Sequence, residues 1–405
     1  MSEKNNKPKA LIIIGGSYLQ LPQIHWAREL GLHVIVTDQN PDVPGQEIAD
    51  QFERINGTDI SAFLSLAFEI EKKYQLIGIY SGSDFGLPVV AAVSQQLNLP
   101  SCSPEAVERA LNKSTARQTW LNNGLPVPRG LKLDSQARAV TAVTKIGLPV
   151  IIKPVDGSGS RGICSVNRMN ELTGALTNAQ TVSHEILMEE LISGRHIDVN
   201  GLFVNGIFQE CGISERFFSP QPFHYPLWGY QEAVLECEHT AVIYQLIEKA
   251  ARCLGIEAGP VKADMILTAT GPILIEMSPR FHGDIGTSFV TPLATGTSPV
   301  KAYFAFLAGQ HNASDLLQPN LSKLAGWIAL FPDVHGRLKT VTGMEQVKQI
   351  KDIAHIFIRA QQGWQMKPPK DNTALAGFVV ACGENLEQLK NTLKTAAKSI
   401  TFMCE

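Results

Sequence analysis

The chain has 405 residues, 44% of them hydrophobic and 18% charged, so its composition is that of a globular protein of two or three domains and excludes a disordered chain. The formal net charge of -3 gives no basic field, and this argues against nucleic acid as a partner. The seven cysteines form no CxxC pair, which argues against a disulfide framework or zinc site and favours a reduced, cytoplasmic location. The apolar run LIII is far shorter than a membrane span, so we expect no membrane partner.

The first hundred residues alternate short β-branched runs with longer amphipathic stretches. Strands are expected at 10–14, 33–38 and 76–82, with helices near 21–30 and 61–73. This rhythm predicts βαβ units and a parallel sheet whose faces are covered by helices.

Ligands of such sheets gather at the carboxyl ends of the strands, which here are Gly15–Ser17, Asp38 and Ser81–Asp84. The dinucleotide fingerprint GxGxxG is broken after Gly16, and this disfavours a dehydrogenase. Ser81–Asp84 is interpreted as a substrate-facing loop or a plain turn.

A second unit is expected to begin at Asn112, which can cap a helix that Gly124 ends. A further helix is predicted at 238–254. The strand pattern indicates a mixed or antiparallel sheet. Its expected strands are LPVIIKP, ILMEE, HIDVNGLFV, IFQECGI, VKADMIL and PILIEMS. From Leu324 onward, short strands and a final polar helix predict a small α+β cap.

The segment PVIIKPVDGSGSRGICSV has the features of a phosphate-binding loop. A buried strand delivers Lys153, and the following Gly157, Gly159 and Gly162 let backbone N–H groups approach anionic oxygens. The P-loop string GxxxxGK[ST] is absent. The alternative is a flexible hairpin tip beside an ordinary lysine.

Two strands on either side of the TATG turn end in carboxylates, Asp264 and Glu276, which a hairpin would bring together. A cation between two desolvated like charges explains such a pair, and hard oxygen ligands suit magnesium. Ser278 lies on the same strand face as Glu276 and can add an oxygen, while Arg280 can neutralise charge that develops during phosphoryl or acyl transfer. The alternative is two solvent-facing acids at a sheet edge.

The segment ILMEELISGRHIDVNG has the residue types of an adenosine site. Glu189 can accept from the adenine amine, the backbone at Leu191–Ile192 can meet the ring, and His196 or Asp198 can meet the ribose. The alternative is an ordinary surface turn after Glu189 and Glu190.

The order of these elements resembles the ATP-grasp superfamily, and the resemblance covers nearly the whole chain. The segments IIIGGSYLQLPQIHWARELGLHVIVTDQNPDVPGQEIAD and EMSPRFHGDIG are similar to carboxyaminoimidazole ribonucleotide synthetase and formate-dependent glycinamide ribonucleotide transformylase. The resemblance implies α/β and α+β architecture in three parts. These are a Rossmann-like pre-ATP-grasp domain at 1–111, an ATP-grasp domain at 112–317 (subdomains 112–187 and 188–317), and a C-terminal α+β domain at 318–405.

The resemblance also implies a role for each matching residue. ATP would be bound by Lys113, Lys153, Gly157, Ser158, Gly159, Ser160, Gly162, Glu189, Glu190, Leu191, Ile192, His196 and Asp198. Mg²⁺, or Mn²⁺ in its place, would be held by Asp264, Glu276 and Ser278, and Arg280 would be the catalytic residue that steadies the acyl-phosphate. Many members have asparagine where Ser278 stands, which puts that ligand in doubt.

The implied reaction is ATP-dependent: a carboxylate forms an acyl-phosphate, and an amine then displaces phosphate to give an amide. The aromatic-rich stretch 217–228 suits an L-amino-acid ligase-like enzyme with small-molecule substrates. The alternatives are a purine-pathway ribonucleotide carboxylase or formyl ligase, and an ATP-binding protein without ligase activity. The family resemblance also implies a homodimer.

Overall fold

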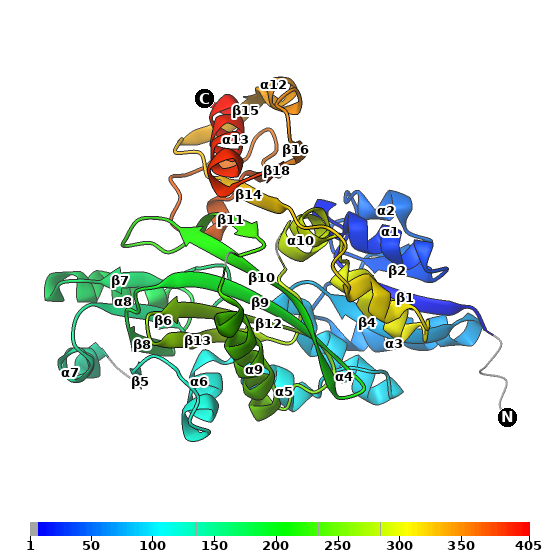
Figure 1. Cartoon of the computed structure of the whole chain (residues 1–405), viewed down its shortest axis with the longest axis horizontal. Helices are drawn as coiled ribbons and strands as arrows, with labels where there is room; N and C mark the ends of the chain where they lie inside the picture. Colours follow the sequence, from blue (N-terminus) through cyan, green and yellow to red (C-terminus); the bar gives the residue numbers. More distant parts are fainter. Residues whose placement is uncertain (1–6, 134–135, 234, 284) are drawn as a thin grey trace.

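The computed structural model describes residues 7–133, 136–233, 235–283 and 285–405 (Figure 1). Its N-terminal region, blue in Figure 1, contains a parallel sheet of strand order β3-β2-β1-β4. The strands are β1 (Lys9–Ile14), β2 (His33–Thr37), β3 (Gln51–Glu53) and β4 (Gln75–Ser81). The helices are α1 (Leu21–Glu29), α2 (Gly45–Ile48), α3 (Ile60–Lys73), α4 (Leu87–Leu97) and α5 (Pro104–Leu111). The parallel sheet predicted from the sequence is confirmed; β3 was missed because QFE carries no long apolar run.

Strand β1 is buried on both faces, which explains its unbroken apolar sequence. Leu11 and Ile13 pack with Ile24 of α1, whereas Ala10 and Ile12 pack with Phe63 of α3 on the other face. The helices that cover the sheet leave its carboxyl ends open to the middle of the molecule.

The second region has a four-stranded sheet of order β5-β8-β6-β7 with antiparallel pairs. Its strands are β5 (Gly130–Leu133), β6 (Val150–Pro154), β7 (Cys164–Val166) and β8 (Ile186–Glu190), and its helices are α6 (Lys113–Asn122), α7 (Gln136–Ile146) and α8 (Leu172–Gln180). Asn112 caps α6 by accepting from the Thr115 N–H, as the sequence predicts. The glycine-rich stretch connects β6 to β7, so it forms one rim of this sheet.

An eight-stranded sheet of order β13-β12-β9-β10-β11-β14-β18-β16 runs through the centre of the molecule. Its strands are β9 (Arg195–Val204), β10 (Ile207–Phe218), β11 (Pro226–Gln231), β12 (Gly259–Thr268), β13 (Gly271–Ser278), β14 (Leu324–Leu330), β16 (Ile353–Ile358) and β18 (Gly377–Gly383). Helices α9 (Cys237–Leu254), α10 (Thr291–Thr295) and α11 (Pro299–Leu307) accompany it. The apolar side of α9 packs on β9 and β12 through Ile243, Ile247 and Val261.

The C-terminal region extends this sheet, because β14 pairs with β11. A second, three-stranded sheet of order β17-β15-β19 lies beside it, with β15 (Gly336–Thr342), β17 (Gln365–Met366) and β19 (Thr401–Cys404). The helices are α12 (Met344–Lys348) and α13 (Leu386–Ser399). The α+β character is as predicted. None of the helices among the described residues is both long and apolar enough to cross a bilayer.

Candidate active site

A cavity of about 190 Å³ lies between the β6–β7 connection and the face formed by β9, β12 and β13. Its lining contains most of the residues that the sequence singles out. They are Lys113, Lys153, Gly157, Ser158, Gly159, Ser160, Leu191, Ile192, His196, Asp198, Asp264, Glu276 and Arg280. Glu189, Glu190, Gly162 and Ser278 are not among the lining residues that the structure describes.

The strand register places the acids of this face in a row. Asp264 on β12 pairs with Glu276 on β13 and with Asp198 on β9. The next row, two residues along each strand, consists of Lys262 paired with Asn200 and Ser278. Side chains two apart share a face of a strand, so a row of three carboxylates lies beside a row with a lysine at its centre.

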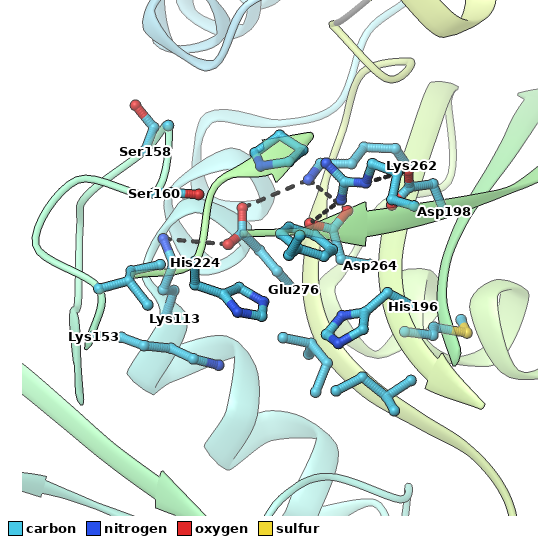
Figure 2. A pocket seen from close by; sticks show the side chains of 18 of the residues that line it. Lys113, Lys153, Ser158, Ser160, His196, Asp198, His224, Lys262, Asp264 and Glu276 are labelled. Atoms are coloured by element: carbon cyan, nitrogen blue, oxygen red, sulfur yellow. Dashed lines mark hydrogen bonds and ion pairs between the residues drawn. The ribbon is translucent and has the colours of Figure 1, made fainter. Parts of the chain in front are cut away.

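Two lysines neutralise the carboxylates of Asp264 and Glu276. The Lys262 Nζ lies 2.9 Å from Asp264 Oδ1 and 3.6 Å from Glu276 Oε1. On the opposite side, Lys113 Nζ lies 3.4 Å from Glu276 Oε2, and Figure 2 shows Glu276 between the two lysines. Burial alone would raise the pKa of both acids, but the neighbouring cations outweigh it and hold both pKa values below their usual range. Both groups are therefore anionic at neutral pH.

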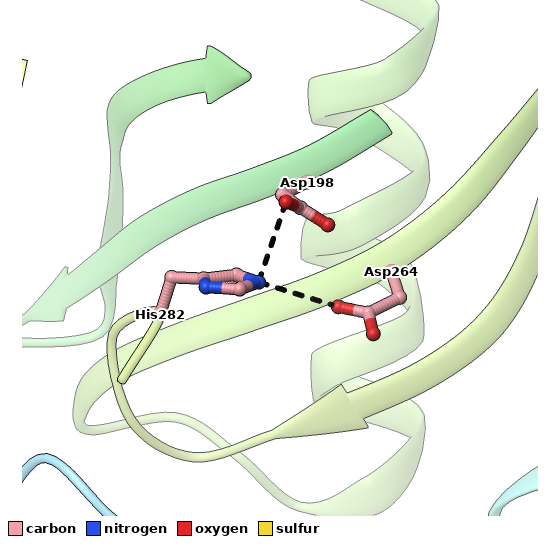
Figure 3. Close-up of side chains that lie close together, drawn as sticks. All are labelled: Asp198, Asp264 and His282. Atoms are coloured by element: carbon pink, nitrogen blue, oxygen red, sulfur yellow. Dashed lines mark ion pairs between the residues drawn. The ribbon is translucent and has the colours of Figure 1, made fainter. Parts of the chain in front are cut away.

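Asp198, Asp264 and His282 form a second close group (Figure 3). The His282 Nε2 lies 3.4 Å from Asp198 Oδ2 and 3.8 Å from Asp264 Oδ1. A ligand atom from each lies within 4.8 Å of the others, which is close enough for one metal ion. However, Arg216 already contacts Asp198 at 2.5 Å and Asp264 at 3.2 Å, so its guanidinium neutralises this group. Asp198, expected near a ribose, is held by Arg216.

Glu189 is buried between two cations. Its Oε2 accepts from Lys153 Nζ at 2.7 Å, and its Oε1 lies 3.4 Å from Arg117 Nε, while the side chain is 2% exposed. A carboxylate held in this way is not directed at the cavity as the expected adenine contact requires. Glu190 also points elsewhere, since it accepts from the backbone N–H and the Nε of Arg129. The two consecutive glutamates, Glu189 and Glu190, therefore mark the end of the strand. However, both side chains pair with arginine or lysine.

Part of the lining of the cavity is apolar. Leu191 and Ile192, which follow β8, line the cavity together with Ile151, Met265 and Ile275. This is the kind of surface that a flat heterocycle occupies.

The β6–β7 connection presents backbone groups to the cavity. Lys113 Nζ donates to the Gly157 carbonyl at 2.5 Å, and the Asn372 N–H donates to the Gly159 carbonyl at 3.2 Å. Gly159 has a φ of 69° and Ser160 a φ of 60°, so the tip of the loop is left-handed. Gly162 has a packing role, because a Cβ there would meet Pro154 Cγ at 2.8 Å.

Arg280 is held by an acid from the N-terminal region. Its Nε and Nη2 each donate to Asp84 at 2.7 Å, and the Ser278 hydroxyl donates to the same carboxylate at 2.7 Å. Burial would raise the pKa of Asp84, but the charge of Arg280 outweighs it and the pKa is lowered. Ser278, expected as a metal ligand, thus binds Asp84. The Ser81–Asp84 segment, left open as a loop or turn, is what positions Arg280.

An aromatic wall closes the remaining side. His224 stacks on Phe218 at 4.2 Å, and His196 lies 4.7 Å from the same ring. Burial, followed by the charges of His196 and Lys153, lowers the pKa of His224 to about 3. Burial also lowers the pKa of His196. Both imidazoles are therefore neutral at pH 7.

Sequence reasoning missed several residues of this site. Lys262 has a detectable signal, because it lies two residues before Asp264 and hence on the same face of its strand. His224 belongs to the stretch 217–228, noted for its aromatic content only, and Arg216 directly precedes that stretch. Asn372 has no local signal, since it is brought to the glycine-rich loop by the fold.

A glycine-rich loop that faces paired carboxylates is compatible with phosphoryl transfer from a nucleotide, and three family models match parts of the chain. The model described as ATP-grasp domain matches residues 146–288, that described as ATP-grasp N-terminal domain matches 24–101, and that described as L-amino acid ligase C-terminal domain 2 matches 328–405.

Individual proteins are also similar to this chain. A D-alanine–D-alanine ligase of Azoarcus sp. (strain BH72) is 31% identical over 211 residues, which are 49% of this chain and 67% of that protein. The uncharacterized protein y4rH of Sinorhizobium fredii is 27% identical, over 99% of this chain and 84% of its own length. The solved structure of L-amino acid ligase from Bacillus licheniformis has a TM-score of 0.82 at 21% identity and covers 99% of this chain and 100% of its own.

The chain belongs to the ATP-grasp family of ATP-dependent carboxylate–amine ligases. It is an enzyme of the ADP-forming type, which activates a carboxylate as an acyl-phosphate before an amine attacks. The superfamily assignment and the fold class predicted from the sequence are confirmed.

Proposed function

We propose that the cavity binds ATP and joins the carboxylate of an amino acid or related small acid to an amine. The adenine would lie against the apolar part of the lining, which includes Ile151, Leu191 and Met265. The phosphates would meet the ammonium groups of Lys113 and Lys153 and the backbone of the loop 157–160.

The row of acids suits a magnesium ion, and Mn²⁺ has the same preference for oxygen donors. Asp264 and Glu276 are paired across two strands and remain anionic, so they are the residues that would hold it. A bound ion of this kind neutralises phosphate charge during phosphoryl transfer. Ser278 is not part of the proposed ligand set, because its hydroxyl donates to Asp84.

The reaction would proceed in two displacements. The substrate carboxylate oxygen bonds to the γ-phosphorus of ATP, and the bond from that phosphorus to ADP breaks. The amine nitrogen then bonds to the acyl carbon, the carbon–oxygen bond to phosphate breaks, and one proton leaves the nitrogen. Arg280, fixed by two bonds to Asp84, would balance the negative charge on the acyl-phosphate and on the tetrahedral oxygen.

The observation that carries the proposal is the Asp264–Glu276 pair, in register and with Lys113 in contact with Glu276. The substrate class rests on the likeness to a D-alanine–D-alanine ligase and to an L-amino acid ligase.

Phosphate release and mass spectrometry of products, with ATP, Mg²⁺ and pairs of amino acids, test this proposal. At least one pair should give a product lighter by one water than the two reactants together. Glu276→Gln should abolish that product, whereas Glu185→Gln, at an exposed ion pair with Lys132, should retain it. ATP binding with no product from any acid and amine would favour the non-catalytic alternative.

The remaining parts of the proposal come from the family resemblance. They are a cytoplasmic homodimer and the three domains at 1–111, 112–317 and 318–405. Light scattering during gel filtration tests the dimer, and limited proteolysis tests the domain boundaries.

A further inference from the structure

Asn372, in the C-terminal region, reaches the glycine-rich loop. Its backbone N–H donates to the Gly159 carbonyl at 3.2 Å, and it lines the same cavity as Lys113 and Ser158. Its Oδ1 is buried without a hydrogen-bond partner among the described residues. A residue far along the chain thus meets the part of the loop that covers the cavity.

The turn that presents this N–H is fixed by its own hydrogen bonds. Asp371 Oδ1 accepts from the Thr373 N–H at 2.8 Å and from the Thr373 hydroxyl at 2.6 Å. The Leu375 N–H donates to the Asn372 carbonyl at 3.2 Å. These bonds hold 371–375 rigid, so the Asn372 N–H has a defined direction.

The loop tip also has two hydrogen bonds within the loop, one on each side of Gly159. The Arg161 Nε donates to the Ser158 carbonyl at 3.2 Å, and the Ile163 N–H donates to the Ser160 carbonyl at 3.3 Å. Between these bonds lies Gly159, whose carbonyl is bonded to Asn372. The left-handed φ of Ser160, 60°, is unfavourable for a residue with a Cβ and requires outside contacts to persist.

We propose that Asn372 is a positioning residue whose backbone N–H holds the glycine-rich loop closed over the acyl-phosphate, so that the C-terminal region controls water access. This inference rests on the proposed function for its chemical consequence. With the loop released, a water oxygen bonds to the acyl carbon and the carbon–oxygen bond to phosphate breaks. The original carboxylate, phosphate and one proton are then released, and ATP is consumed without an amide.

Two substitutions separate the backbone donor from the side chain. Asn372→Pro removes the N–H, and proline is tolerated there because Asn372 is the first residue of the short helix 372–374 and Asp371 is extended (φ -159°, ψ -175°). Asn372→Ala keeps the N–H. Hydrogen–deuterium exchange of 156–163 without nucleotide should rise about 2- to 10-fold in the proline variant. It should stay near wild type in the alanine variant.

Turnover gives the second readout. In Asn372→Pro the ratio of ATP consumed to amide formed should rise severalfold, with the KM for ATP changed much less. Unchanged loop exchange in Asn372→Pro, or the same rise in Asn372→Ala, would overturn the proposal. Exchange is measured without ATP, so it does not depend on catalysis. If the wild-type protein makes no amide but exchange of the loop still rises in Asn372→Pro, the proposed function is refuted and the contact is established.

A disulfide cross-link tests the same contact independently, in case the proline variant does not fold. A Cβ built on Gly159 would lie 3.6 Å from the Asn372 Cβ, a separation that suits a disulfide. Oxidised Gly159→Cys/Asn372→Cys should form this bond and slow exchange of the loop, with reversal on reduction. Absence of the cross-link in folded protein, by peptide mapping, would contradict the contact.

Discussion

The two walls of the cavity are built in opposite ways. The wall of β9, β12 and β13 carries side-chain charges whose positions follow from strand register, and Asp264 has Lys262 and Arg216 as partners. The loop wall presents backbone groups from a left-handed tip that depends on a few hydrogen bonds. The sheet wall is therefore preorganised for charge, whereas the loop wall can open for a nucleotide and close again.

Removal of the cation on β6, just before the loop, should have the largest effect. In Lys153→Met, Glu189 stays buried with Arg117 as its remaining cation, which should destabilise the fold by about 3–5 kcal/mol. ATP affinity should also fall about 10- to 150-fold, since a charge-assisted bond to phosphate is lost. Urea unfolding and nucleotide titration measure the two effects.

Lys132→Met is the matched control, because the Lys132–Glu185 pair on the same sheet is about half exposed (44% and 52%). It should cost less than about 1 kcal/mol and leave ATP affinity unchanged. Equal losses in both variants would mean that burial of the Lys153–Glu189 pair has no special importance.

The link between the N-terminal region and the sheet wall should show the next largest effect. Asp84→Asn keeps an acceptor oxygen for Arg280 but removes the negative charge and one of two parallel bonds. Unfolding free energy should fall by about 2 kcal/mol, and kcat should drop more than the KM for ATP changes. Glu248→Gln, at the exposed pair with Arg252, should cost about 0.5 kcal/mol or less. A pure loss of ATP affinity in Asp84→Asn would argue against a role through Arg280.

The sequence predicted features that depend on local periodicity. The apolar run of β1, the cap at Asn112 and the hairpin that pairs Asp264 with Glu276 follow from residues close in the chain. Residue order was sufficient to place Lys153 and Arg280 beside the same cavity.

The sequence did not predict side-chain contacts whose partners are distant in the chain. The Ser278 hydroxyl donates to Asp84, and Glu189 accepts from Lys153 and lies beside Arg117, because a buried polar group without a partner is costly. Such partners are set by how the N-terminal sheet and helix α6 dock, which no local pattern encodes. The same reason hid Asn372, whose contact with Gly159 joins two separate sheets.

The aromatic wall should make stability depend on pH. His224 has a pKa of about 3 in the folded chain and about 6.5 when unfolded, so the unfolded state binds more protons between these values. Stability contributed by neutral His224 is thus complete above pH 6.5 and is lost as pH falls toward 3. Between pH 7 and 5.5 the loss should be about 1 kcal/mol. His224→Phe preserves the stack on Phe218 and should flatten this part of the unfolding profile; an identical slope in both proteins would contradict the pKa.

The smallest expected effect concerns the helix that delivers Lys113 to both walls. The Asn112 side chain accepts from the Thr115 N–H, and the Lys113 N–H donates to the Val155 carbonyl at the start of the loop. Asn112→Ala should cost about 0.5–1 kcal/mol by thermal or urea unfolding, whereas Asn112→Asp restores a capping oxygen and should cost little. Because Lys113 Nζ touches both Gly157 and Glu276, loosening of its helix should raise the KM for ATP slightly in the alanine variant. A KM increase as large as that of Lys153→Met would contradict this, because it would make the start of the helix as important as Lys153 for the position of the phosphates.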